Sequence, residues 1–460
     1  MGFWRIGGLC CLVACAHASE GPPASGQSGA IAHYAVTIFD NFDGARVRAC
    51  VEGANIRAWV PIDNSAAHGL SGAWAEGTAV EATNGRIPLR ESSHTSCVDY
   101  ETRFGSSRFR LDDSSAVILS QAQWLWRPDP FPQGLNASVR FAVPLGGQVS
   151  LPWPRSDATY FPAKSAFFTE TYGVFGDFAR QTFSVAGATV DVARLGPRPP
   201  DDDVRRWLGR AVQTAASVGD RFPRDRVHFV IVPVDSPGEE VLFGMVRRGG
   251  GPSILLLPSS DATVGQLEAD WVAIHELSHL WMPRLVPEDR WLSEGIATYL
   301  QEVLRARCGL QDPTRAWTRI HEGFERGRRS GTGRDLSSES RNMNRTGAYH
   351  RVYWAGTAFA MEVDLRLRQE SNGEVTLLTA LSRAEQRWSA DARPVSAAVL
   401  LHAMDDAAGS RFIEELGGKY AAKSDFPDTA HIDSREYRRI RAQITAPAEK
   451  ACGVSAESSP

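Results

Sequence analysis

The sequence has no surplus of positive charge and no long apolar run. Its 54 acidic and 50 basic residues give a formal net charge of −4. Because nucleic-acid binding depends on clustered positive charge, this balance argues against a nucleic-acid partner. Internal repeats, dinucleotide-binding glycine motifs and phosphate loops are also missing. With 460 residues, 43% of them hydrophobic, the chain is long enough for two or three globular domains.

The first 18 residues have the pattern of an export signal. A single arginine, Arg5, precedes an apolar run at 6–14 that is too short to cross a bilayer, and small residues follow it. Residues 12–15 resemble a bacterial lipobox, in which Cys15 would carry a lipid; the alternative is ordinary cleavage after residue 18. We expect an exported protein of the bacterial periplasm or cell envelope, either lipid-anchored through Cys15 or secreted. Residues 19–30 would then be a flexible tether.

Cysteine is scarce, and three of the seven cysteines lie in the expected signal. The other four form an even set in a chain expected to enter an oxidising compartment. Four cysteines allow three pairings, and proximity along the chain favours two of the bonds. These are Cys50 with Cys97 and Cys308 with Cys452. The alternative is four buried free thiols.

The segment His275-Glu276-Leu277-Ser278-His279 carries the strongest functional signal. Residues four apart on a helix lie on one side, so both imidazoles can hold one zinc ion. Glu276 follows the first histidine, where its carboxylate reaches a metal-bound water rather than the metal. The alternative is a chance match to a short pattern on an amphipathic helix.

Glu294, within the segment WLSEGIATY at 291–299, is the candidate for a third ligand. Pro283 and Pro287 end the first helix, so that a second helix, N-capped near Ser293, can present Glu294 to the same ion. Two histidines and one glutamate leave a coordination position for water, as in catalytic zinc sites. The expected site is one Zn²⁺ held by His275, His279 and Glu294.

Together these two segments resemble the gluzincin metallopeptidases of the thermolysin-like clan, and within it the aminopeptidase N and glycyl aminopeptidase families. In those families HExxH is followed by an Asn/Ser-Glu-Gly-x-Ala element, which here is residues 293–297. The spacer between the second histidine and the glutamate is shorter here. The resemblance implies a zinc peptidase with Glu276 as general base.

Residues 242–248 resemble the edge strand that precedes HExxH in the related aminopeptidases. There, Gly-x-Met-Glu-Asn pairs with the substrate backbone, and its glutamate holds the substrate's amine. The resemblance implies that a peptide binds by β-addition along Gly244, Met245, Val246 and Arg247. Because Val246 fills the glutamate position, an amine-binding carboxylate is missing there, and Glu239 or Glu240 is the candidate replacement. We expect Arg247 and Arg248 to repel an amine and to favour acidic side chains.

Tyr353 lies in the segment Tyr-Trp-Ala-Gly at 353–356. This segment resembles the Tyr-x-Lys-Gly segment of the same families, whose tyrosine stabilises the oxyanion. Ala355 replaces the lysine. The resemblance implies that the Tyr353 hydroxyl donates to the developing negative charge; the alternative is a buried structural tyrosine.

The predicted fold is multidomain. Short β-type runs separated by turn residues between 31 and 196 predict an N-terminal antiparallel β-sandwich. Residues 197–310 predict helix, strand, edge strand, strand and HExxH helix, which is the order of a thermolysin-like α+β catalytic lobe. Residues 311–455 predict a helical C-terminal lobe.

These patterns predict a zinc-dependent peptidase that acts on a peptide or protein, as an exopeptidase or an endopeptidase. The first alternative is a non-catalytic peptide-binding protein on a gluzincin scaffold. The second is a zinc hydrolase of a non-peptide amide or ester. Membrane contact is expected only through the N-terminal lipid, and the sequence predicts no oligomeric state.

Overall fold

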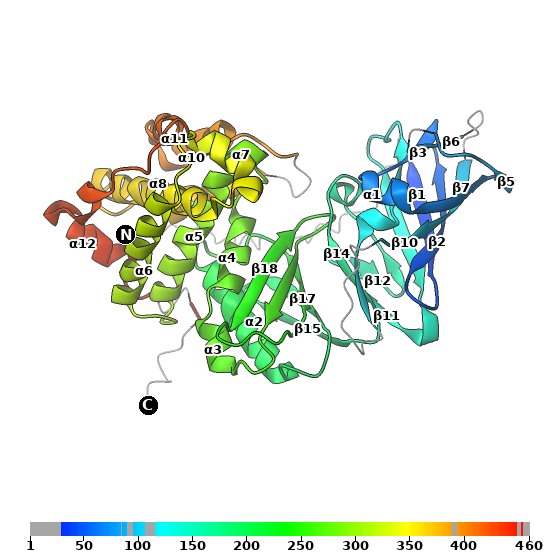
Figure 1. Cartoon of the computed structure of the whole chain (residues 1–460), viewed down its shortest axis with the longest axis horizontal. Coiled ribbons are helices and arrows are strands. Elements are labelled where there is room, and N and C mark those ends of the chain that lie inside the picture. The colour runs from blue at the N-terminus through cyan, green and yellow to red at the C-terminus, as the bar shows by residue number, and fades with distance from the viewer. Residues whose placement is uncertain are drawn as a thin grey trace, which may run out of the picture.

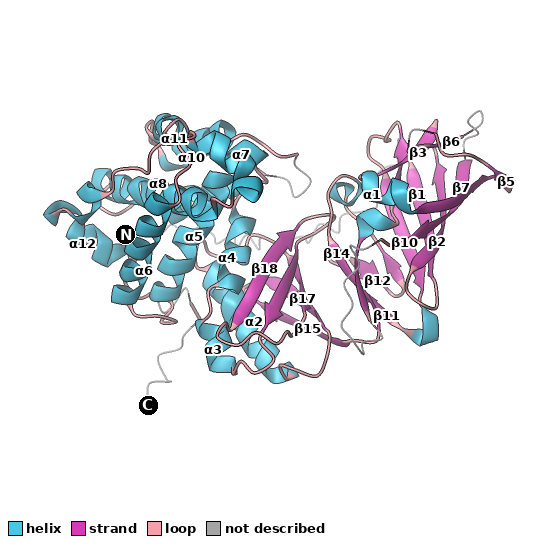
Figure 2. Ribbon diagram, viewed as in Figure 1, coloured by secondary structure: helices cyan, strands magenta, loops and turns pink. Residues whose placement is uncertain are grey.

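The computed structural model describes residues 29–83, 85–89, 95–105, 116–388, 393–448 and 452–453. A β-rich N-terminal part, a central sheet with helices packed against it and a helical C-terminal part follow one another along the molecule (Figures 1 and 2). The expected signal peptide, Cys15 and nearly all of the expected tether lie outside the described residues. Among the described helices, none has the length and apolar character of a membrane span.

The largest N-terminal sheet has the order β12-β13-β10-β1-β2-β7-β4-β5. Its strands are β1 (Ile31–Ile38), β2 (Gly44–Glu52), β4 (Leu70–Ala75), β5 (Thr78–Ala79), β7 (Thr95–Arg103), β10 (Asn136–Ala142), β12 (Arg155–Ser156) and β13 (Thr159–Tyr160). Exposed and buried residues alternate along β1, as expected for a strand with one face in a core. The Cys50–Cys97 disulfide joins β2 and β7, on which the two cysteines are paired in register.

The expectation of purely antiparallel sheets is wrong at one position, because β1 and β10 run parallel. Parallel neighbours need a long crossover connection. Here the segment that connects β1 to β10 also forms much of the other two sheets. Those sheets have the orders β11-β14-β8 and β6-β3-β9. Their strands are β3 (Ala58–Pro61), β6 (Ile87–Pro88), β8 (Val117–Ser120), β9 (Trp126–Asp129), β11 (Gln148–Ser150) and β14 (Tyr172–Gly176), and helix α1 (Asn64–Gly69) follows β3.

The central sheet has the order β15-β16-β17-β19-β18. Its strands are β15 (Ala179–Val185), β16 (Ala188–Arg194), β17 (Arg226–Ile231), β18 (Val241–Arg247) and β19 (Ser253–Pro258). β15 and β16 precede residue 196, where we expected the N-terminal domain to end, yet β16 pairs with β17 in parallel. The sheet pairing therefore corrects that boundary to an earlier position, before β15. Local sequence predicts a strand but not which sheet the strand joins.

Helices cover the central sheet and continue to the C-terminus (Figure 1). Those nearest the sheet are α2 (Asp201–Ala216), α3 (Val264–Ala269), α4 (Val272–Ser278) and α5 (Arg290–Arg307). The others are α6 (Pro313–Arg329), α7 (Leu336–Thr346), α8 (Tyr349–Glu370), α9 (Leu377–Glu385), α10 (Ala397–Ala408), α11 (Ile413–Ala421) and α12 (Arg435–Ile444). The Cys308–Cys452 disulfide links the end of α5 to the C-terminal segment.

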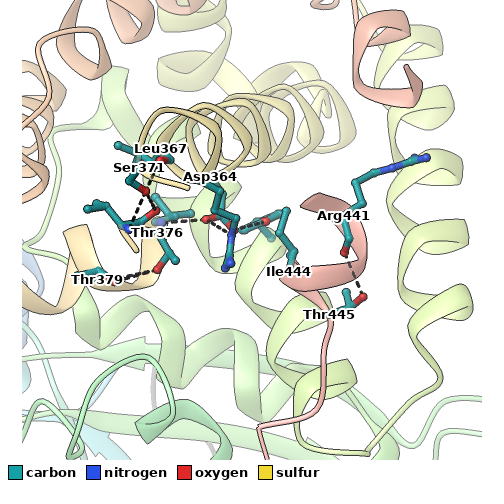
Figure 3. Close-up of polar contacts among 12 residues, drawn as sticks. Asp364, Leu367, Ser371, Thr376, Thr379, Arg441, Ile444 and Thr445 are labelled. Carbon is teal, nitrogen blue, oxygen red and sulfur yellow. Dashed lines mark hydrogen bonds and ion pairs between the residues drawn. The ribbon is translucent and has the colours of Figure 1, made fainter. Parts of the chain in front are cut away.

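A buried carboxylate, Asp364 on α8, connects three helices (Figure 3). It accepts hydrogen bonds from the Leu377 backbone N–H at the start of α9, at 2.9 Å, and from the Tyr299 hydroxyl on α5, at 2.8 Å. The Thr376 side chain caps the N-terminus of α9. Because each bond satisfies a group that would otherwise be buried without a partner, the network fixes how α5, α8 and α9 meet.

His228 joins the N-terminal part to the central sheet and makes the fold sensitive to acid. Its fully buried ring contacts the Ser150 hydroxyl at 2.9 Å and the Ser253 hydroxyl at 2.8 Å. Burial lowers the pKa of His228 to about 3. In the unfolded chain the His228 ring takes up a proton near pH 6.5, whereas in the folded chain it stays neutral. The stability that the neutral ring contributes is therefore complete above pH ~6.5 and is lost as pH falls toward ~3.

We therefore expect His228 to steepen the loss of stability in acid. Between pH ~6.5 and ~5 the buried neutral ring should account for a loss of roughly 2 kcal/mol in the free energy of unfolding. Urea unfolding of the wild type and of His228→Asn, which can still bond to both serines, measures this difference. Equal pH slopes in the two proteins would refute the assignment.

Candidate metal centre

The helix that carries the HExxH motif is buried along its length. Residues 272–278 form α4, and the 3₁₀ turn η4 (His279–Trp281) continues it. The Asp270 carboxylate accepts from the Val272 backbone N–H at 2.7 Å and so caps the N-terminus. At the other end Arg248 donates to the carbonyls of His279 and Met282. Both ends of the motif are thereby fixed.

Glu294 faces the motif from α5, but the helix start differs from our expectation. Ser293 is not the N-cap, because the turn η5 (Pro287–Asp289) leads into α5, which begins at Arg290. Ser293 lies in the first turn of α5, and its hydroxyl contacts Nδ1 of His279 at 3.0 Å. The residue expected to cap the helix therefore orients a histidine of the motif.

The three candidate ligands converge. One ligand atom from each of His275, His279 and Glu294 lies within 4.8 Å of the other two. Oε2 of Glu294 is 3.3 Å from Nε2 of His275 and 3.4 Å from Nε2 of His279. Two imidazole nitrogens and a carboxylate oxygen, gathered around one point, form a donor set suited to Zn²⁺.

Gln301, which the sequence patterns above did not indicate, fixes the His275 ring. Its Nε2 donates to the Glu302 carboxylate at 2.9 Å, so its Oε1 faces Nδ1 of His275, at 2.8 Å. An amide oxygen only accepts, so Nδ1 carries a proton, and Nε2 is the ring nitrogen that faces Glu294. Gln301 follows Glu294 by two helical turns on α5, and this spacing was the available signal.

The two acids of the centre have opposite pKa shifts. Burial raises the pKa of Glu276 above its usual range, and the neighbouring His275 and His279 oppose this only in part. Burial also acts on Glu294, but the two histidines outweigh it and hold the pKa of Glu294 well below its usual range. Two carboxylates in one site with different proton affinities suit a permanent ligand and a proton acceptor.

Tyr353 lies inside α8 and faces the same centre. Its ring stacks on His275, with ring centroids 6.1 Å apart and an interplanar angle of 12°. Burial, followed by the charges of Glu294 and Glu276, raises the pKa of Tyr353 far above that of free tyrosine. The phenol therefore stays protonated and keeps a donor at the centre.

The edge strand β18 lies beside α4 (Figure 1) and touches the expected base directly. The Val246 backbone N–H donates to Oε2 of Glu276 at 2.9 Å. A Cβ added at Gly244 would lie 2.4 Å from the Val272 side chain and 2.9 Å from that of Glu276. Position 244 therefore needs glycine for this close approach.

The two arginines at the end of β18 differ from our expectation. Arg248 is occupied by backbone carbonyls behind the HExxH helix, so it does not face a substrate on β18. Arg247 lies 3.4 Å from the Glu170 carboxylate and over the Tyr172 ring. Met245 accepts from the Tyr172 hydroxyl at 3.1 Å. Of these two arginines, Arg247 is the one that could act on a substrate's charge, and Glu170 partly offsets it.

Solved structures with a similar fold include zinc metallopeptidases. No protein-family model matches the sequence, and neither does any curated protein. The structure is similar to an aminopeptidase N family protein from Idiomarina loihiensis, at 16% identity and TM-score 0.65, over 87% of this chain and 77% of that one. It is also similar to an M1 zinc metallopeptidase from Deinococcus radiodurans, at 16% identity and TM-score 0.53, over 87% and 94%.

A third similar structure is a mutant of a two-domain M1 zinc metallopeptidase bound to L-arginine. It shares 15% identity and a TM-score of 0.55, over 88% of this chain and 96% of that one. These likenesses confirm the gluzincin, aminopeptidase-like fold that the sequence resemblance implied.

Proposed function

We propose, from a fold shared with zinc metallopeptidases, that this protein is a zinc-dependent peptidase. One observation carries the proposal: the ligand atoms of His275, His279 and Glu294 meet around one point, with Glu276 and Tyr353 beside them. A fold alone does not specify activity. This set of residues supports hydrolysis because it contains ligands, a proton acceptor and a hydrogen-bond donor together.

The residues present fit a zinc ion. Both histidines have Nδ1 engaged, by Gln301 and by Ser293, which leaves each Nε2 for the metal. When bound, zinc would supply a more acidic water and a polarised substrate carbonyl.

Proton transfer would fall to Glu276. Its raised pKa suits a group that accepts a proton from the attacking water and returns it to the leaving nitrogen. The Val246 N–H holds one carboxylate oxygen, Oε2, and leaves the other oxygen to act on the water. Tyr353 would donate its phenolic proton in a hydrogen bond to the carbonyl oxygen as negative charge develops there.

A peptide substrate would extend β18 by one strand. In the described structure β18 pairs with β19 on one side only, so its other edge offers backbone groups to an extended chain. The positions involved are Gly244, Met245, Val246 and Arg247. Because the Val246 N–H already serves Glu276, we expect the substrate to use the other backbone groups of this segment.

The mode of cleavage follows from what surrounds Val246. An exopeptidase that acts at the N-terminus must pair the substrate's free amine with a carboxylate, since burying an unpaired ammonium is costly. Glu239 and Glu240 precede the start of β18 at Val241, at the opposite end of the strand from Val246 and Arg247. Glu170 is already paired with Arg247.

We therefore expect internal cleavage, with weak or no removal of single N-terminal residues. Mass spectrometry of a peptide-library digest, run with free and N-acetylated members, measures this. Cleavage should be similar in both sets and should stop when zinc is chelated. Release of N-terminal residues that acetylation abolishes would show that another acid holds the amine, and Glu170→Gln and Glu240→Gln would then identify it.

We further propose that the protein works in an oxidising compartment. Both disulfides present in the structure, Cys50–Cys97 and Cys308–Cys452, support this location because such bonds persist outside the reducing cytosol.

A further inference from the structure

A buried line of side chains leads from the metal centre along α5. It begins at His275, whose Nδ1 lies 2.8 Å from Oε1 of Gln301. Nε2 of Gln301 then donates to Oε1 of Glu302 at 2.9 Å. Gln301 and Glu302 are both buried, and in the described part of the chain Glu302 reaches His275 through Gln301.

The second carboxylate oxygen of Glu302, Oε2, has donors of its own. Nε2 of Gln311 donates to it at 2.8 Å, and Nη1 of Arg305 donates to it at 3.4 Å. Gln311 also donates to the Glu302 backbone carbonyl, at 2.9 Å. Arg305 in turn donates to the Ala269 carbonyl, shortly before the HExxH helix begins. Both oxygens of the carboxylate are therefore fixed in place.

The amide of Gln301 has two orientations of nearly the same shape. In the one present, its oxygen faces His275 and its NH₂ group faces Glu302. A carboxylate that pairs with an arginine only accepts hydrogen bonds, so Glu302 favours this orientation.

The reverse orientation would harm the metal centre. The NH₂ group of Gln301 would then face Nδ1 of His275, and Nδ1 would have to accept. The ring proton would consequently lie on Nε2, the nitrogen that faces Glu294. A nitrogen that carries a proton has no lone pair for a metal.

We propose that Glu302 is a positioning residue of the zinc site. It holds the amide of Gln301 in the orientation that keeps a proton on Nδ1 of His275 and leaves Nε2 for zinc. This inference rests on the zinc site of the proposed function. The alternative is that Glu302 only stabilises α5 through its ion pair with Arg305. Breaking a buried ion pair destabilises a fold in either case, so the test must measure more than stability.

Glu302→Gln tests the proposal. Arg305 and Gln311 still require an acceptor, so the new amide oxygen should take the place of Oε2 and its NH₂ group should face Gln301. Gln301 must then rotate and direct its own NH₂ group at His275. Loss of such an outer partner weakens metal binding by roughly 10–100-fold. Competition with a chelator at constant pH measures the zinc affinity.

Exchanging the two side chains should reverse this loss. In the double variant Gln301→Glu with Glu302→Gln, the carboxylate at position 301 can accept both from Nδ1 of His275 and from the amide at position 302. Zinc affinity should return to near the wild-type value. A double variant that binds zinc as weakly as Glu302→Gln would overturn the proposal.

Glu362→Gln is the matched control. Glu362 is also buried on a helix, pairs with an arginine one turn later, Arg366, and accepts from the Tyr420 hydroxyl. This variant should lose stability in urea and keep the zinc affinity of the wild type. An equal loss of zinc affinity in Glu362→Gln and Glu302→Gln, or wild-type affinity in Glu302→Gln, would contradict the proposed role.

Nuclear magnetic resonance of ¹⁵N-histidine in the metal-free protein provides a second measurement. The His275 signals are identified by their absence in His275→Gln. Nδ1 of His275 should carry a proton in the wild type and lack it in Glu302→Gln. An Nδ1 signal that is the same in both would refute the role of Glu302. Because neither measurement uses hydrolysis, failure here is distinct from failure of the proposed peptidase function.

Discussion

Glu276→Gln is expected to abolish peptide hydrolysis and to leave the metal bound. Glutamine keeps the size of the side chain, and its amide oxygen can still accept from the Val246 N–H. It cannot take the proton of the attacking water. Loss of a general base lowers kcat by roughly 10²–10⁴-fold. Because Glu276 is not one of the three converging ligands, zinc content should not change.

Turnover of a peptide that the wild type cleaves, measured beside metal analysis of the same samples, tests this expectation. Glu268→Gln is the control, since Glu268 lies on α3 and pairs with Arg206 at the surface. That variant removes one carboxylate but should keep full activity. Equal turnover in Glu276→Gln and the wild type would remove Glu276 from the mechanism.

Gly356→Ala is expected to disrupt both the fold and the metal centre. Helices α5 and α8 approach so closely here that a Cβ at position 356 would lie 2.0 Å from the Trp291 carbonyl oxygen and 2.8 Å from the Gly295 Cα. Both obstacles are backbone atoms, so the helices themselves must separate. Overpacking of a core lowers the free energy of unfolding by about 1–3 kcal/mol. Because the clash here is with backbone atoms, we expect a loss at or above the upper end of that range.

The same separation would displace α5, and with it Glu294, relative to the two histidines of the HExxH helix. Gly356→Ala should therefore lower both the free energy of unfolding in urea and the affinity for zinc. Gly418→Ala is the control, because Gly418 lies in α11 with open space around it. That variant should be neutral or slightly stabilising, as alanine favours helix. Wild-type stability in Gly356→Ala would contradict the close helix contact.

The local features of the site could be predicted from the sequence because they depend on helical spacing. Four residues of separation put His275 and His279 on one side of a helix, and Pro287 starts the turn that brings Glu294 back. The role of Ser293 could not be predicted, because it depends on where α5 begins. A proline opening a 3₁₀ turn and a serine N-cap are both valid starts, and local sequence does not decide between them.

Long-range pairing was the part that local patterns could not reveal. β15 and β16 have ordinary strand sequences, and only the sheet order shows that they join β17. The parallel pairing of β1 with β10 could not be predicted either. Alternation of apolar and polar residues predicts a strand but not the direction of the neighbouring strand. The prediction that Arg248 faces a substrate was wrong, because a β-strand pattern does not show that the residue after β18 turns behind the HExxH helix.

Metal analysis of the purified, folded protein shows whether His275, His279 and Glu294 hold zinc. We expect about one zinc per wild-type chain, little zinc in His279→Ala, and peptide hydrolysis that chelation removes and added zinc restores. Circular dichroism should show that the variant keeps the helix content of the wild type. Folded wild-type protein that neither contains zinc nor takes it up would rule out the zinc site and would favour a peptide-binding protein on this scaffold.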